Sequence, residues 1–359
     1  MKQLIAGIIA LLIYSVLAGY IGWAVFSWLE SMRLPVNGWF FAFLWTVWAF
    51  SFFIGRLGHK WLGFSIAGSY WLGFLQYALL LIPIANVLIL AIDIPMDIQI
   101  IGSVTAIIFL LIFMIGTFLA YSPVVRHQEI HVDGSGEDIT IVIASDFHLG
   151  FLSGKRHLRR FVKLSNSLEP DLVLLAGDLV DDDPIWYARY GMSETMKKLT
   201  AKYGVFGVLG NHEYYGKKIP LLVRVMEESG VSILRDETVE VAGKFHISGR
   251  EDRTNGKRHP LEYLKPAGNL PWIVMDHTPS DLKTPVQLAA DLHISGHTHK
   301  GQMWPNRFIT KRVFELDYGY RKKGDTHFIV SSGFGFWGPP IRIGSRSELW
   351  MVKMKFQNS

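Results

Sequence analysis

The sequence contains no cysteine among its 359 residues. A disulfide framework is therefore excluded, and so is any metal site built on thiolate ligands. A metal bound by this chain has to be held by carboxylate, imidazole and amide groups.

Charge is nearly absent from residues 1–125, which contain four Lys/Arg and three Asp/Glu out of 36 and 31 in the chain. These charges leave four uncharged runs, which cover residues 3–29, 34–55, 61–92 and 98–125. Each run can supply the roughly 20 apolar residues that a helix needs to cross a bilayer core of about 30 Å. This segment contains Trp23, Trp28, Trp39, Trp48, Trp61 and Trp71. Several of them lie near run ends, where indoles favour the headgroup region. We predict an all-α transmembrane domain of four helices over residues 1–125.

The first run has an alternative interpretation as a cleaved signal peptide, because Val16-Leu17-Ala18 resembles a small-residue cleavage site. However, Lys2 is the only charge of its amino-terminal region, and apolar sequence continues to Trp28. An uncleaved anchor is therefore the favoured interpretation.

The few basic residues that flank the four runs predict the topology. The amino terminus, the loop 56–60 and the exit at residue 126 lie on one side of the membrane and carry four basic residues. The two opposite loops carry one, Arg33, together with Asp93 and Asp97. The four on the first side are Lys2, Arg56, Lys60 and Arg126. Because basic loops stay inside, we expect a multi-pass protein of the inner cell membrane with residues 126–359 in the cytoplasm.

Residues 126–359 have the pattern of an alternating α/β domain. Short Val-, Ile- and Leu-rich runs are typical of buried strands, and they cover Ile139–Ala144, Asp171–Ala176, Val205–Leu209, Trp272–Met275 and Leu292–Ile294. Segments with helical spacing lie between them, at Leu158–Leu168, Glu194–Ala201 and Leu221–Ser229.

Polar motifs follow these five strands. They are Asp146-Phe147-His148, Gly177-Asp178, Gly210-Asn211-His212-Glu213, Asp276-His277 and Gly296-His297-Thr298-His299. Ligands of open α/β sheets gather beyond the carboxyl ends of the strands. We therefore expect the motifs to converge on one metal site. Taken alone, the Asp146 and Asp178 motifs are more typical of turns, whereas the two interpretations of the His297–His299 motif are nearly balanced.

In this order the motifs resemble the calcineurin-like metallophosphoesterase superfamily, and the resemblance covers about residues 138–355. The closing segment resembles a bacterial branch whose members are often membrane-tethered, through Gly301-Gln302, Tyr318-Gly319, Ser331–Gly338 and Pro339-Pro340. The resemblance implies an α/β (α+β) sandwich of two mixed sheets flanked by helices over residues 126–359.

The resemblance also implies a role for each motif residue. Asp146, His148 and His299 would hold a first metal ion, and Asn211, His277 and His297 a second. Asp178 would bridge the two ions. His212 would bind no metal but would donate a proton to the leaving oxygen or steady the charge on phosphorus. Two such ions activate water for attack on a phosphoester; the ligand types suit Mn²⁺ first, then Fe²⁺, Zn²⁺ or Co²⁺. The neighbouring Asp181-Asp182-Asp183 is interpreted as a solvated charge run.

Apolar residues flank the motifs, and core packing and a lipid or nucleobase contact explain them equally well. They are Phe147, Phe151, Leu152, Trp186, Tyr187, Tyr190, Phe334, Phe336 and Trp337. Basic clusters occur at Lys155-Arg156, Arg159-Arg160 and Arg321-Lys322-Lys323. They are typical of solvated faces, yet each charge beside an anionic bilayer is worth about 1 kcal/mol.

The favoured hypothesis is therefore a phosphoesterase that has the lipid bilayer as its partner and hydrolyses a phosphoester or pyrophosphate bond in a lipid-linked substrate. The resemblance offers UDP-2,3-diacylglucosamine pyrophosphate hydrolysis as one candidate. Three alternatives remain: an anchored phosphodiesterase or phosphatase of soluble nucleotides, a non-catalytic scaffold, and a transport role, which no charge inside the four runs supports. No nucleic acid is expected as a partner.

Overall fold

The computed structural model describes residues 2–91, 97–134 and 137–357, and it divides into two compact units. The first is residues 1–116, here called the membrane unit, and the second is residues 117–359, here called the C-terminal unit. The last long helix of the first segment ends at Tyr121 and the first strand begins at Val124. The domain boundary that composition places after residue 125 stays a prediction.

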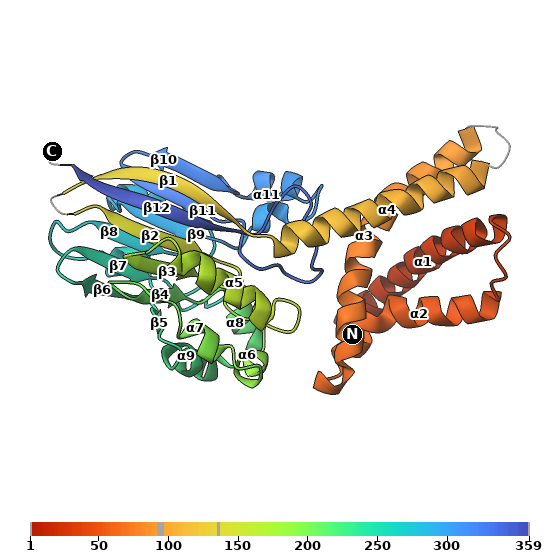
Figure 1. Cartoon of the computed structure of the whole chain (residues 1–359), viewed down its shortest axis with the longest axis horizontal. Helices are drawn as coiled ribbons and strands as arrows, with labels where there is room; N and C mark the ends of the chain where they lie inside the picture. The colour runs from red at the N-terminus through yellow and green to blue at the C-terminus, as the bar shows by residue number, and fades with distance from the viewer. Residues whose placement is uncertain (1, 92–96, 135–136, 358–359) are drawn as a thin grey trace. The chain divides into compact units, whose positions relative to one another are not determined.

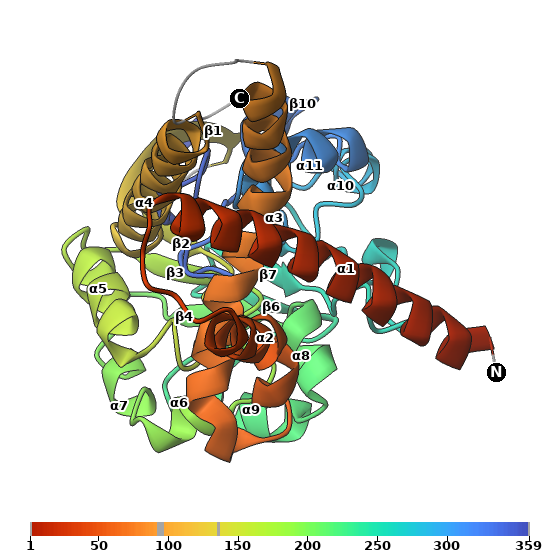
Figure 2. The same cartoon turned by 90° about the vertical axis from the view of Figure 1, so that its right-hand side faces the viewer.

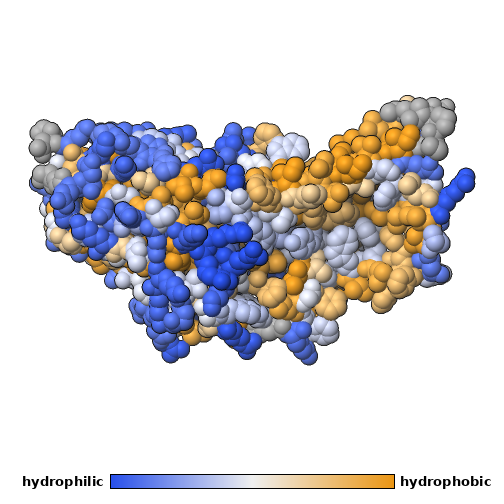
Figure 3. Space-filling view, viewed as in Figure 1, coloured by the Kyte–Doolittle hydropathy of each residue, from blue (hydrophilic) through white to orange (hydrophobic). Residues whose placement is uncertain are grey.

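The membrane unit is built from the four expected helices (Figure 1). Asp93, one of the loop charges used to predict the topology, lies outside the described residues. They are α1 (Lys2–Ser31), α2 (Gly38–Gly55), α3 (Leu62–Ala91) and α4 (Asp97–Tyr121). All four are long and apolar enough to cross a membrane. Their apolar side chains dominate the surface of this unit in Figure 3. That surface is typical of helices that face lipid rather than water.

Some of the tryptophans lie inside the helix bundle rather than at its ends. The indole of Trp45 donates a 2.9 Å hydrogen bond to the carbonyl of Ala18, and that of Trp48 donates one of 3.1 Å to the carbonyl of Ala67. Trp71 is fully buried and packs edge-on against both indoles. Trp48 and Trp71, which lie well inside their apolar runs, thus hold neighbouring helices together.

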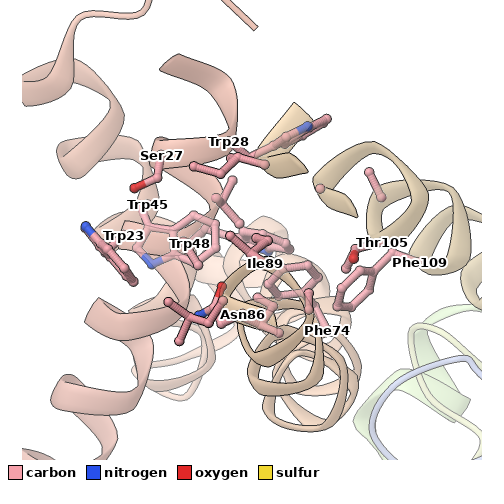
Figure 4. A pocket seen from close by; sticks show the side chains of 18 residues that line it. Trp23, Ser27, Trp28, Trp45, Trp48, Phe74, Asn86, Ile89, Thr105 and Phe109 are labelled. Atoms are coloured by element: carbon pink, nitrogen blue, oxygen red, sulfur yellow. The ribbon is translucent and has the colours of Figure 1, made fainter. Parts of the chain in front are cut away.

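The four helices also enclose an apolar cavity of about 570 Å³. Figure 4 shows the aromatic side chains that line it, among them Trp23, Trp28, Trp45 and Phe109, with the polar Asn86. The side-chain amide of Asn86 donates to the hydroxyl of Tyr20 at 2.8 Å, so this polar group is satisfied within the bundle.

The C-terminal unit contains two six-stranded mixed sheets. The first has the order β1-β12-β2-β3-β4-β5 and the second the order β10-β11-β9-β8-β7-β6. The first six strands by number are β1 (Val124–Asp133), β2 (Ile139–Ala144), β3 (Leu172–Ala176), β4 (Val205–Val208), β5 (Ser232–Ile233) and β6 (Glu237–Val241). The others are β7 (Phe245–Gly249), β8 (Trp272–Met275), β9 (Leu292–Ser295), β10 (Gly319–Lys323), β11 (Thr326–Val330) and β12 (Glu348–Gln357).

Short helices cover the outer faces of these sheets. They are α5 (Lys155–Asn166), α6 (Ile185–Arg189), α7 (Ser193–Met196), α8 (Asn211–Gly216), α9 (Ile219–Glu227), α10 (Lys283–Gln287) and α11 (Arg307–Val313). In Figure 2, α5 and α10 lie on opposite sides of the strands. The predicted sandwich of two mixed sheets flanked by helices is confirmed.

Alternation along the strands builds the core, because successive side chains of a strand point to opposite faces. Ile141 and Ile143 of β2 pack against the second sheet, in one cluster with Ile273 and Met275 of β8. Val142, between the first two, packs with Phe161 of α5 and other residues of the helical layer. Both sheets are therefore covered on both faces, and their strand ends can point polar groups into one crevice.

The predicted elements that lead to the motifs are present within a few residues, but one predicted helix is much shorter. In place of the predicted helix Glu194–Ala201, the structure has the four-residue helix α7, Ser193–Met196. The backbone N–H of Thr200 donates at 3.1 Å to the side chain of Asn166, so it does not extend the helical hydrogen-bond ladder.

Candidate metal centre

Five strand ends meet at one edge of the sandwich, and each supplies motif residues. Asp146 and His148 follow β2, Asp178 follows β3, and Asn211 with His212 follows β4. On the other sheet, His277 follows β8, and His297 with His299 follows β9. The structure brings all seven predicted ligands together with His212.

The three residues predicted for the first ion form one buried cluster. Asp146, His148 and His299 each present a ligand atom within 4.8 Å of the others. Nε2 of His148 lies 3.1 Å from Nε2 of His299, and this second nitrogen lies 3.4 Å from Oδ1 of Asp146. Two ring nitrogens and a carboxylate oxygen that face one another are a donor set that suits a divalent cation.

The residues predicted for the second ion gather around the side-chain oxygen of Asn211. Nδ1 of His297 lies 2.8 Å from this oxygen, and Nε2 of His277 lies 3.2 Å from it. Nδ1 of His277 donates at 2.8 Å to the carbonyl of Ala176. A carbonyl can only accept, so Nε2 is the nitrogen of His277 that can face a metal.

Asp178 stands between the two groups, as a bridging carboxylate must. Its Oδ2 lies 3.6 Å from Nε2 of His148 in the first group and 3.2 Å from Nε2 of His277 in the second. Burial raises the pKa of Asp178, but the facing charge and hydrogen bond of His277 outweigh burial and hold it well below the usual value. The carboxylate is therefore ionised.

Burial holds His148, His297 and His299 neutral, which is the form of histidine that binds metals. Burial lowers the pKa of His148 to about 3 against the opposing charge of Asp178, and it lowers the pKa of His297 to about 4. His277 differs, because the charge of Asp178 outweighs burial and raises its pKa well above the usual value. A cation bound at His277 would displace that proton.

The backbone at the site is strained. Left-handed φ angles occur at five of the seven predicted ligands: Asp146 (51°), His148 (44°), Asp178 (50°), His297 (70°) and His299 (48°). Such angles cost of order 1–3 kcal/mol for a residue with a side chain, and they persist where the surroundings enforce them, typically at functional sites. The strain therefore supports a functional role for these turns.

The motif glycines are required by close packing against the ligands. A Cβ on Gly177 would overlap the ring of His277, one on Gly210 would overlap the carboxylate of Asp178, and one on Gly296 would overlap that of Asp146. Only glycine lets backbone and ligand approach this closely. The Gly-Asp and Gly-His dipeptides are thus parts of the site and not merely turns.

His212 has a partner that the sequence did not predict. Its Nδ1 lies 2.7 Å from Oδ1 of Asp182. Burial lowers the pKa of His212, but this hydrogen bond and the charges of Asp178 and Asp181 outweigh burial and raise it to about 9. The interpretation of Asp181–Asp183 as a solvated charge run is therefore wrong for Asp182, although its side chain is partly exposed.

Two further buried residues support the site. The carboxylate of Glu213 accepts backbone N–H groups from Asp178 (3.1 Å), Val180 (3.0 Å) and Gly210 (2.6 Å), and so fixes the two loops that carry Asp178 and Asn211. The guanidinium of Arg342 is fully buried and lies 3.3 Å from Nδ1 of His299. Glu213 belongs to a predicted motif, whereas no local pattern marks Arg342.

The apolar residues near the motifs divide between core and surface. Phe147, Tyr187, Phe334 and Phe336 are buried, so core packing is correct for them. Three others are exposed, namely Phe151 (37%), Tyr190 (42%) and Trp337 (54%). The ring centre of Trp337 lies 6.2 Å from that of His212, so part of the apolar set borders the site.

Comparison with known proteins agrees with this geometry. Residues 139–301 match the family model for calcineurin-like phosphoesterases. An uncharacterized metallophosphoesterase of Aquifex aeolicus is 30% identical over 229 residues, which cover 61% of this chain and 86% of that protein. An uncharacterized metallophosphoesterase of Helicobacter pylori is 30% identical over 244 residues, which cover 66% of this chain and 65% of that protein. The chain thus spans just under two thirds of the Helicobacter relative.

A third relative combines the same two features. The Danio rerio protein named transmembrane protein with metallophosphoesterase domain is 29% identical over 258 residues, which cover 66% of this chain and 58% of that protein. Four long apolar helices together with this relative indicate association with a membrane.

Proposed function

Because this chain belongs to the calcineurin-like metallophosphoesterase family, we propose that it hydrolyses a phosphoester or pyrophosphate bond in a lipid-linked substrate at the membrane surface. Two divalent cations, Mn²⁺ by preference, would activate water and neutralise phosphate charge when bound. Asp146, His148 and His299 would hold one, and Asn211, His277 and His297 the other. Asp178 would contact both.

His212 would act on the substrate itself. Its Nδ1 is engaged by Asp182, which leaves Nε2 as the nitrogen that can donate a proton. With a pKa of about 9 the ring is protonated at neutral pH. It can therefore donate to the departing oxygen, or stabilise the charge on the phosphoryl group, as a general acid does.

A set of exposed apolar side chains, of which Trp337 lies beside His212, is the observation that favours a lipid-linked substrate. We call it the apolar rim; it comprises Trp304, Phe308, Ile309, Val313 and Trp337, all of which are at least half exposed. Gln302 connects the segment of Trp304 to that of Trp337. Its side chain accepts from the backbone N–H of Trp337 at 2.9 Å and donates to the carbonyl of the same residue at 2.8 Å. Contiguous exposed apolar groups mark contact with lipid or with another protein.

The residue types of the apolar rim fit a lipid better than a soluble nucleotide. A nucleobase would be served by one aromatic face such as that of Trp337. Phe308, Ile309 and Val313 on α11 offer aliphatic and aromatic surface that a soluble nucleotide does not need, while Lys311 and Arg312 of the same helix suit anionic headgroups.

The test compares a vesicle-embedded lipid phosphoester with its deacylated, water-soluble analogue, using the Mn²⁺-loaded full chain. We expect the embedded substrate to be cleaved at least tenfold faster, and Phe308→Ser to reduce that preference. Tyr263→Ser is the matched control, because Tyr263 is exposed but lies outside the apolar rim. Equal rates on the two substrates would favour the alternative function, an anchored phosphodiesterase or phosphatase of soluble nucleotides. UDP-2,3-diacylglucosamine is one candidate for the substrate panel.

We also propose that the protein is a multi-pass inner-membrane protein whose catalytic unit faces the cytoplasm, on the four-to-one basic bias of its flanks. The absence of native cysteine makes the test direct. A membrane-impermeant thiol reagent added to intact cells should label Val36→Cys and should not label Lys257→Cys; the reverse result would contradict the topology.

A further inference from the structure

The outward face of α5 is entirely basic. The helix carries five Lys/Arg and no acidic residue. Its inward face packs into the core through residues such as Leu158 and Phe161. Arg156, Arg159 and Lys163, spaced three and four residues apart, therefore share the opposite, exposed face. Hydrophilic side chains gather over α5 in Figure 3.

Among the described residues, this basic face is not matched by carboxylates. In the part of the chain that the structure describes, no carboxylate lies within the 4.0 Å of an ion pair from Arg156, Arg159, Arg160 or Lys163. Cations of one sign on one helix face repel each other. An external anion would relieve that repulsion.

A cavity of about 580 Å³ adjoins the face. Arg160 and Lys163 line one part of it, and apolar groups of Phe118 and Leu164 line another. Phe118 is 61% exposed. The cavity therefore combines two cations with an apolar wall, which is the composition that fits an amphiphile with a charged head.

The cavity is formed where a membrane-crossing helix ends. Its residues Thr117, Phe118 and Tyr121 belong to the last turns of α4. Arg160 donates to the carbonyl of Tyr121, and the hydroxyl of Tyr121 donates to the carbonyl of Leu152 at 3.0 Å. These bonds fix α5 beside the end of the span, which is the height of the lipid headgroups.

We propose that this cavity binds an anionic membrane phospholipid, with its phosphate on Arg160 and Lys163 and an acyl chain along Phe118 and Leu164. The apolar wall selects a lipid over a free phosphate ion, which has no group to place there. Arg156 and Arg159 lie farther along the same face and contact neighbouring headgroups. The site does not depend on the proposed phosphoesterase activity, because it uses none of the predicted metal ligands.

Native mass spectrometry of the full chain in detergent tests the proposal. Dioleoyl phosphatidylglycerol is titrated in, with dioleoyl phosphatidylcholine as the zwitterionic reference. We expect the wild-type chain to retain the anionic lipid in preference. The double variant Arg160→Gln/Lys163→Gln should bind it roughly thirtyfold more weakly, the change that corresponds to about 1 kcal/mol for each lost charge.

Two further variants keep the result interpretable. Arg253→Gln/Lys257→Gln removes the same charges from an exposed loop outside the cavity and should bind like wild type. Lys163→Glu changes one exposed residue, so it should fold normally and still bind more weakly than wild type. Equal retention by wild type and the Arg160/Lys163 variant, equal loss in the loop control, or displacement of the lipid by millimolar inorganic phosphate would each overturn the proposal.

Discussion

Nδ1 of His212 lies 2.7 Å from Oδ1 of Asp182, and the two residues belong to segments that follow the neighbouring strands β4 and β3. The carboxylate fixes the ring's orientation and favours its protonated form. Asp182 lies outside the predicted ligand groups, so the pair can be tested without removing a metal ligand.

Asp182→Asn should lower turnover about tenfold while metal content stays unchanged, because the amide cannot stabilise the charged imidazole as a carboxylate does. His212→Ala should lower turnover about 10²-fold or more, as expected when a general acid is lost. In the double variant, turnover should match His212→Ala alone, since Asp182 acts through His212.

The neighbouring Asp183 provides the control for this pair. It forms an ion pair with Lys218 at 2.7 Å, so Asp183→Asn should leave turnover near the wild-type rate. If His212→Ala lost metal together with turnover, His212 would be a ligand and its role as proton donor would be wrong.

Asp178→Asn should remove nearly all turnover and most of one equivalent of bound metal. The carboxylate lies between the two ligand groups, and its charge would offset the mutual repulsion of two bound cations. Metal analysis of the purified variant, together with turnover at saturating Mn²⁺, checks the prediction. Wild-type activity in this variant would contradict the bridging role.

Gly210→Ala should lower metal content and turnover together, even though it removes no ligand. The added Cβ would overlap the carboxylate of Asp178 and the backbone beside it. Gly256→Ala is the matched control, because open space surrounds Gly256. Normal metal binding by Gly210→Ala would show that the loop can shift without cost, contrary to the close packing seen in the structure.

The strands that lead to the site were predictable because they are continuous apolar runs buried on both faces, as in β2 and β3. β1 and β12 were not predicted, although they pair in parallel over ten residues. β1 is half exposed and contains four consecutive polar residues, from Arg126 to Glu129, so it has no long apolar run. Long-range pairing, which single-sequence patterns do not contain, defines it.

The same division holds within the candidate site. The predicted ligands lie in short motifs directly after strands, and the structure brings them together. Asp182 contacts His212, and Arg342 contacts His299; both partners are distant in the sequence. Local composition therefore predicted only a solvated charge run at Asp182 and nothing at Arg342. Tertiary packing, rather than motif spacing, assigns such supporting residues.

His157 gives a test of stability against pH outside the metal site. The ring is buried between α5 and the loop at Phe334, whose carbonyl lies 2.8 Å from its Nε2. Burial lowers the pKa of His157 to about 4, although the hydrogen bond to Phe334 opposes the shift. In the unfolded chain a histidine has a pKa of about 6.5.

Between these two values the unfolded chain binds a proton that the folded chain does not, so acidification favours unfolding. The stabilisation is complete above pH 6.5 and is lost as the pH falls toward 4. From pH 7 to pH 5 the loss of folding stability due to His157 should be about 2 kcal/mol.

The variant His157→Gln cannot titrate, yet its amide can still donate to the carbonyl of Phe334. In denaturant titrations of the full chain in detergent, this variant should therefore lose about 2 kcal/mol less than wild type over that interval. A His157→Gln curve parallel to wild type would contradict the assignment of a buried, neutral imidazole.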